Sequence, residues 1–127
     1  MILDSSVAAE VAIGSEFGRR AIPHLSDELF VPELFFAEFF SVLKKLRIRK
    51  VVDAAKADEA IEVLRGLRLI ALPIHQLTEA LWKLSQRVSA YDAHYVVLAK
   101  ELNLPLATFD ERLASNRDLG VKFLVFR

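Results

Sequence analysis

The chain has 127 residues, which suits one domain with a real core, and we predict a single domain over residues 1–127. Its 17 Lys and Arg residues balance its 17 Asp and Glu residues, so no overall charge points to nucleic acid or a membrane surface as a partner, and any basic patch must be local. It contains no Cys, which excludes disulfides, thiolate nucleophiles and Cys-based zinc sites and makes a reducing cytoplasm the expected compartment.

Hydrophobic residues make up 54% of the chain, a high fraction for a protein of this size. This surplus predicts that part of the apolar surface is buried in a homodimer or against a second protein. The chain opens Met-Ile-Leu-Asp without a basic region, and its longest apolar run is interrupted by Glu33 and Glu38. We therefore expect neither a signal peptide nor a membrane span.

Short apolar strands alternate with helical segments along the chain. We expect strands at residues 2–3, 29–31, 68–72, 106–108 and 121–126, and helices from about residue 7, over 15–26, 32–49, 53–67, 78–86 and 89–102, and from 111 to about 118. Pro32 is expected in the first helical turn, Asn103 in a left-handed conformation that closes a helix, and Trp82 in the core. This alternation predicts an α/β fold, a three-layer α/β/α sandwich with a mostly parallel central sheet of about five short strands.

Four isolated carboxylates occupy similar apolar surroundings. Asp4 follows the first strand, Asp110 follows the strand at 106–108, Asp92 lies in the opening turn of an apolar helix, and Glu38 stands among phenylalanines. Sites in parallel sheets lie beyond the carboxyl ends of the strands, so Asp4 and Asp110 should share one edge. Asp92 can lean on that edge, and Glu38 reaches it only if its helix packs across the sheet.

Two of these acids also have a purely structural interpretation. Ser89 and Asp92 have the spacing of a capping box at a helix N-terminus. Thr108 and Glu111 have the same spacing on either side of Asp110, so Asp110 can also be explained as part of a helix start. Ser5 and Ser6 similarly offer cap chemistry for the first helix. For Asp92 taken alone the structural interpretation is favoured, and it is the recurrence of four such acids that points to function.

Carboxylates that converge repel one another, and a divalent cation relieves that repulsion. Sites made only of oxygen favour hard ions such as Mg²⁺, with which a metal-activated water can hydrolyse a phosphodiester bond without a side-chain nucleophile. The three histidines, His24, His75 and His94, are scattered along the chain and lack the spacing of metal ligands. We expect them at the surface or hydrogen-bonded in the core.

These residues resemble those of PIN-domain proteins, and more narrowly the VapC-type toxin subunits of VapBC toxin–antitoxin systems. The matching segments cover essentially the whole chain and are Leu3-Asp4-Ser5-Ser6-Val7, Val31-Pro32-Glu33-Leu34 leading to Glu38, Ser89-Ala90-Tyr91-Asp92-Ala93, and Leu106-Ala107-Thr108-Phe109-Asp110-Glu111-Arg112-Leu113. Each segment alone is a weak signal, but the four in this order are fairly specific.

The resemblance implies a metal-dependent endoribonuclease that cleaves single-stranded or looped RNA, forms homodimers and is inhibited by an antitoxin. It implies that Asp4, Glu38, Asp92 and Asp110 hold Mg²⁺ or Mn²⁺, supported by the hydroxyls of Ser6 and Thr108. Some relatives carry a further acid after the last motif, and the imperfect candidates here are Glu111, Asn116 and Asp118.

Other functions fit the sequence less well. Haloacid-dehalogenase-like phosphatases need a second Asp at position 6, where this chain has Ser, and receiver domains need a paired acid near the end of the first strand. The remaining alternative is a non-catalytic PIN-like module that binds protein or RNA. From position alone, the expected phosphate-binding residues are Lys44, Lys45, Arg47, Arg49, Arg87 and Arg112.

Overall fold

A computed structural model describes residues 1–126 of the chain. Its centre is a five-stranded sheet made of β1 (Ile2–Leu3), β2 (Leu29–Pro32), β3 (Leu69–Leu72), β4 (Leu106–Thr108) and β5 (Phe123–Val125). The strand order is β3-β2-β1-β4-β5, and all four pairings are parallel. The predicted sheet is therefore confirmed, and it is parallel throughout. The shortest strand, β1, lies in the middle and is fully buried, as its apolar pair Ile-Leu requires.

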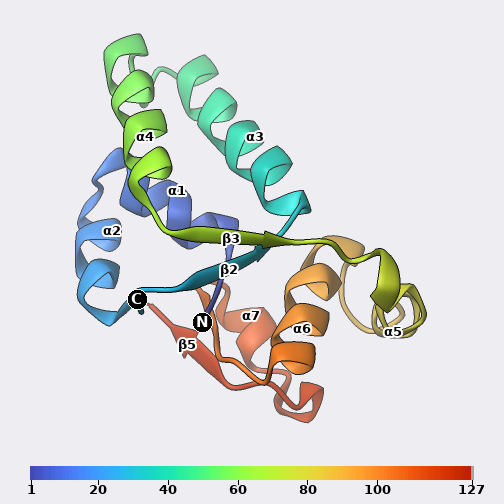
Figure 1. Cartoon of the computed structure of the whole chain (residues 1–127). Coiled ribbons are helices and arrows are strands. Elements are labelled where there is room, and N and C mark those ends of the chain that lie inside the picture. The colour runs from blue at the N-terminus through green and yellow to red at the C-terminus, as the bar shows by residue number, and fades with distance from the viewer. Residues whose placement is uncertain (127) are drawn as a thin grey trace.

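Helices cover both faces of this sheet (Figure 1). Their bounds are α1 (Ser5–Ile13), α2 (Glu16–Ala21), α3 (Leu34–Ile48), α4 (Ala54–Gly66), α5 (Thr78–Leu84), α6 (Ala90–Leu102) and α7 (Glu111–Ala114). Single 3₁₀ turns occur at Ile22–His24, His75–Leu77 and Arg117–Leu119. Helix α1 packs against α2, α3 and α4 on one side, and α6 packs against β1, β2 and β4 on the other, with α5 beside it.

Several helix ends differ from the sequence prediction. Asp4, rather than a serine, is the N-cap of α1, and its side chain accepts a hydrogen bond from the backbone N–H of Ser6. Pro32 is the last residue of β2 instead of the first of α3; a strand end tolerates its missing N–H. Asn103 does adopt the left-handed conformation expected of it, with φ 53°.

The helix expected from residue 111 to about 118 is interrupted after one turn. Ser115 Oγ donates to the carbonyl of Arg112 at 2.7 Å, and Asn116 Nδ2 donates to the same carbonyl at 3.2 Å. Such side-chain bonds compete with the next helical hydrogen bonds, and the chain continues as a 3₁₀ turn instead.

Trp82 was expected in the core, and this expectation is wrong. Its side chain is 72% exposed on α5, a helix whose one buried residue is Leu84. The assignment rested on residue type alone, because a seven-residue helix is too short for its apolar periodicity to identify the buried face. Within residues 1–126, no helix is both long and apolar enough to cross a membrane.

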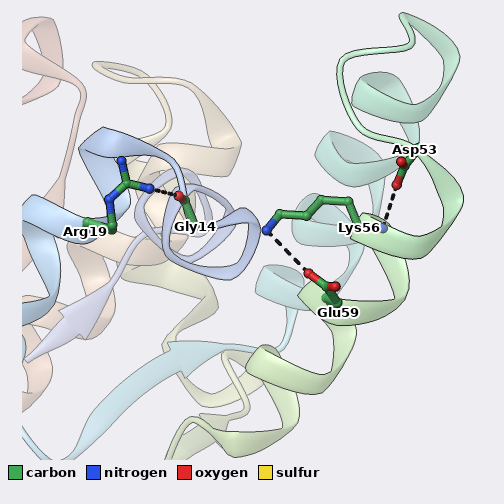
Figure 2. Close-up of polar contacts among 5 residues, drawn as sticks. All are labelled: Gly14, Arg19, Asp53, Lys56 and Glu59. Atoms are coloured by element: carbon green, nitrogen blue, oxygen red, sulfur yellow. Dashed lines mark hydrogen bonds and ion pairs between the residues drawn. The ribbon is translucent and has the colours of Figure 1, made fainter.

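The C-terminal end of α1 is held between α2 and α4 (Figure 2). Gly14 closes α1 with φ 68°, and its carbonyl accepts a hydrogen bond from Arg19. From α4, the Lys56 ammonium reaches toward Gly14 while bonding Glu59 at 3.4 Å, and so brings positive charge to the negative end of the α1 dipole. This packing anchors the C-terminal end of α1, the helix that Asp4 caps at its other end.

Gly18 is required by the close approach of α2 to α1. A Cβ at this position would lie 2.1 Å from the carbonyl oxygen of Glu10 and 2.4 Å from its carbon, distances at which the backbone itself must move. Glycine thus sets the spacing between these two helices.

Candidate metal-binding acidic cluster

Asp4 lies at the carboxyl end of the central strand and is held by donors on both of its oxygens. Thr108 Oγ1 donates to Asp4 Oδ2 at 2.7 Å. On the other side, the Ser6 backbone N–H at 3.4 Å and Ser5 Oγ at 3.5 Å donate to Oδ1. The carboxylate is therefore fixed in orientation by the neighbouring strand β4 and by the first turn of α1.

Thr108 connects two of the acids. Its side chain is fully buried at the end of β4, and the same hydroxyl that donates to Asp4 accepts the backbone N–H of Asp110 at 3.0 Å. Asp110 is itself the N-cap of α7, with Oδ1 accepting the Leu113 N–H at 2.9 Å. The cap of this helix is thus Asp110 rather than the Thr108 and Glu111 pair.

Glu38 comes from the second turn of α3 and is half-buried. Tyr95, buried on α6, donates its hydroxyl to Glu38 Oε1 at 2.6 Å, although the two residues are 57 positions apart in the sequence. Burial raises the pKa of Glu38, the Tyr95 hydrogen bond opposes this, and the charges of Asp4 and Asp92 raise it further. Burial and the hydrogen bond to Glu38 raise the pKa of Tyr95, so its hydroxyl stays a donor.

Asp92 occupies the first turn of α6. The Ser89 hydroxyl accepts its backbone N–H at 3.0 Å, so the predicted cap exists. Burial raises the pKa of the Asp92 carboxyl, and the Ser89 hydrogen bond lowers it. The charges of Asp4 and Asp110 raise it again, and Arg112 lowers it. Asp92 therefore lies both in a capped helix turn and within reach of other negative charges.

The fold brings together the four acids singled out in the sequence. Asp4 and Asp110 follow the adjacent strands β1 and β4. Glu38 lies on α3, which follows β2, and Asp92 lies in the first turn of α6. Glu38 is close enough to Asp4 and Asp92 to be repelled by both charges. Asp92 is likewise repelled by Asp4 and Asp110. We call these four residues the acidic cluster.

The acidic cluster suits Mg²⁺ or Mn²⁺, because every candidate ligand is a carboxylate oxygen. A bound cation would also offset the repulsion between the carboxylates. Within residues 1–126, however, no three His, Asp or Glu side chains are arranged closely enough to hold a metal ion as they stand. His94, the histidine nearest the cluster in sequence, contacts the Ala90 carbonyl through Nδ1 at 2.6 Å.

The supporting residues divide into those the structure places at the cluster and those it does not. The Thr108 hydroxyl is bonded to Asp4, whereas the buried Ser6 hydroxyl has no partner within residues 1–126 and only its backbone reaches Asp4. Asp118 pairs with Arg87, and Asn116 donates its amide to backbone carbonyls of α7. Glu111 lies in the first turn of α7.

Three of the six basic candidates adjoin the cluster. Arg87 and Arg112 line a hollow of about 430 Å³ together with Asp92, and Lys45 lines another of about 450 Å³ together with Glu38. The remaining three, Lys44, Arg47 and Arg49, line neither hollow, and the Arg47 guanidinium bonds the Val52 carbonyl at 3.2 Å.

Tyr95 and Ser5 are residues of the site that the sequence analysis missed. A tyrosine within a buried apolar helix signals that its hydroxyl has a partner, but the sequence does not show which one. Ser5 was treated as a cap residue, and its hydroxyl instead touches the acid that caps the helix.

Known proteins resemble this chain in sequence and in structure. The family model described as PIN domain matches residues 1–119. Ribonuclease VapC9 of Mycobacterium tuberculosis is 34% identical over 114 residues, which cover 90% of this chain and 88% of that protein. A toxin–antitoxin complex from Klebsiella pneumoniae contains a similar structure, with a TM-score of 0.71, 14% identity and coverage of 98% of this chain and 95% of that one. VapC20 of M. tuberculosis, a toxin that cleaves the sarcin–ricin loop, aligns with a TM-score of 0.66 and 16% identity, over 91% of this chain and 94% of that one.

Proposed function

The chain belongs to the PIN-domain family, and we propose that it is a metal-dependent endoribonuclease, the toxin of a type II toxin–antitoxin pair. The observation that carries this proposal is the convergence of four carboxylates at one edge of the sheet, with Asp4 held in place by Thr108. The ribonuclease names of its sequence relatives support the same reaction.

Asp4, Glu38, Asp92 and Asp110 would hold Mg²⁺ or Mn²⁺. When bound, the metal would neutralise the cluster, activate a water and polarise the scissile phosphate. No protein nucleophile is needed, which agrees with the absence of Cys from the chain and with the supporting roles of the nearby hydroxyls.

The other residues of the site position these carboxylates. Thr108, the last residue of β4, bridges Asp4 and the backbone of Asp110 and so orients two acids at once. Tyr95 remains protonated and holds Glu38 by one oxygen, which leaves the second oxygen for a ligand. Arg112 and Arg87 offer donors for phosphate groups beside Asp92, and Lys45 offers one beside Glu38.

The proposed partners follow from the surface and from the relatives. An antitoxin is the proposed protein partner, by analogy with the toxin–antitoxin complex among the structural neighbours. Exposed apolar side chains near the end of α3, among them Ile48 and Val51, support a homodimer. We further propose one domain that acts in the cytoplasm.

The test is to titrate Mg²⁺ or Mn²⁺ into purified protein and follow cleavage of a mixed single-stranded RNA pool, with EDTA as the blank. We expect cleavage to appear with metal, disappear with chelator and fall about 100-fold or more in Asp92→Asn. Asp58→Asn, which changes an exposed acid on α4, is the matched control and should cleave normally. Chelator-resistant cleavage, or an undiminished rate in Asp92→Asn, would contradict the proposal, and RNA binding without any cleavage would favour the non-catalytic module.

A further inference from the structure

A hollow of about 450 Å³ opens beside the acidic cluster, between α3 and the first turn of α6. Glu38 forms part of its wall, so the hollow begins at one of the proposed metal ligands. Its lining also contains Ser41, Lys45 and Tyr91. The volume lies within the range of pockets that bind small organic groups.

Tyr91 is the unusual member of this lining. Its side chain is 60% exposed, and within residues 1–126 no other ring packs against it and no group bonds its hydroxyl. Tyr95, one turn later on the same helix, is buried and committed to Glu38. Tyr95 is therefore part of the packed fold, whereas the ring of Tyr91, next to Asp92 in the sequence, is free to contact a ligand.

The hollow combines the three kinds of group that hold an unpaired nucleotide. A free aromatic face stacks a base, a hydroxyl such as that of Ser41 can bond a base edge or the ribose 2′-hydroxyl, and an ammonium such as that of Lys45 attracts phosphate. The second hollow, on the Asp92 side, differs in character, because it has no aromatic residue and contains the two arginines Arg87 and Arg112. One side of the acidic cluster thus suits a base, and the other suits the phosphate backbone.

We propose that the hollow lined by Tyr91, Ser41 and Lys45 is a nucleobase subsite, in which a base next to the scissile phosphate stacks on the Tyr91 ring. The inference rests on the proposed ribonuclease function and adds to it a site for one base of the substrate. A base stacked on Tyr91 cannot remain in a helical stack, so the substrate at this position is unpaired RNA.

The test measures binding, so that it is independent of cleavage. Asp110→Asn serves as the background, because Asn caps a helix as well as Asp does while one charge of the proposed metal site is removed. Affinity is measured by fluorescence anisotropy in Mg²⁺ for a short single-stranded RNA and for a series in which one abasic residue is moved along it. One abasic position should weaken binding about 5- to 150-fold, the equivalent of roughly 1–3 kcal/mol for one base–aromatic stack.

That position-specific loss should vanish when Tyr91→Leu is added and persist when Tyr91→Phe is added, because phenylalanine keeps the ring. Trp82→Leu, which removes a more exposed ring on α5, is the matched control and should leave the abasic profile unchanged. The proposal is overturned if Tyr91→Leu binds all the RNAs as its parent does, or if its abasic profile is unchanged. It is also overturned if Tyr91→Leu alters only the sedimentation of the protein, which would assign the ring to a protein interface. Failure of the wild-type protein to cleave RNA would instead contradict the proposed function. The binding assay would still decide whether a base stacks on Tyr91, because it does not depend on cleavage.

Discussion

Thr108 is the residue whose substitution the structure predicts most sharply. Its hydroxyl lies in a fully buried side chain, donates to Asp4 Oδ2 at 2.7 Å and accepts the Asp110 N–H at 3.0 Å. Thr108→Val keeps the branched shape and replaces the hydroxyl by a methyl group. Both partners then lose the hydrogen bond that the Thr108 hydroxyl made.

The expected cost follows from these two bonds. Losing a hydrogen bond to a carboxylate costs about 1.5–3 kcal/mol, and the partly exposed Asp110 N–H, which can recover water, adds up to about 1 kcal/mol. Burial of the new methyl group returns roughly 0.8 kcal/mol. We therefore expect Thr108→Val to destabilise the protein by about 1–3 kcal/mol, which for a chain of this size lowers Tm by roughly 4–11 °C.

The assay is urea unfolding in EDTA, followed by circular dichroism, for wild type, Thr108→Val and Thr108→Ser. The serine variant keeps the hydroxyl, and the loss of one buried methyl group should cost it about 1 kcal/mol. Apolar packing alone predicts the opposite order, with valine neutral or stabilising and serine worse. A valine variant at least as stable as wild type would refute the reasoning. Metal affinity should also fall about 10- to 100-fold with valine and change little with serine.

Three further outcomes are expected. Because burial and the charges of Asp4 and Asp110 raise the pKa of the Asp92 carboxyl, the folded state disfavours its charge. Stability without metal should therefore rise as pH falls from neutral through that raised pKa, and rise less in Asp92→Asn, as thermal melts in EDTA would show. Gly18→Ala, whose Cβ would clash with the α1 backbone, should lower the free energy of unfolding by about 1–3 kcal/mol or more. Gly66→Ala, at a helix end with nothing within 4 Å of the added Cβ, should leave it unchanged or raise it by up to about 1 kcal/mol. Equal urea midpoints for the two variants would contradict this. Trp82→Gln should change the free energy of unfolding by no more than about 0.5 kcal/mol, and a larger loss would mean that the exposed ring is covered in solution.

Strand positions and the edge that carries the acids could be predicted from the sequence, because short apolar runs followed by a carboxylate leave little choice. The strand order could not, since β1 is too short to show which strands flank it. The hydrogen bond from Tyr95 to Glu38 also lay beyond sequence reasoning, because it joins residues 57 positions apart through the packing of α3 and α6. The error at Trp82 has a similar cause, as burial of a short helix depends on what packs against it.

Helix capping and a place in the proposed metal site are compatible at one residue. Asp4 and Asp110 are the N-caps of α1 and α7, and Asp92 lies in the capped first turn of α6. A capping hydrogen bond fixes the position of a carboxylate while it remains near the surface. Three such positions around the end of β1 bring like charges together without burying an unpaired carboxylate in the core. It follows that Asn variants, which preserve a cap and remove the charge, separate folding from function, whereas Ala variants at Asp4 or Asp110 remove both and cannot distinguish them.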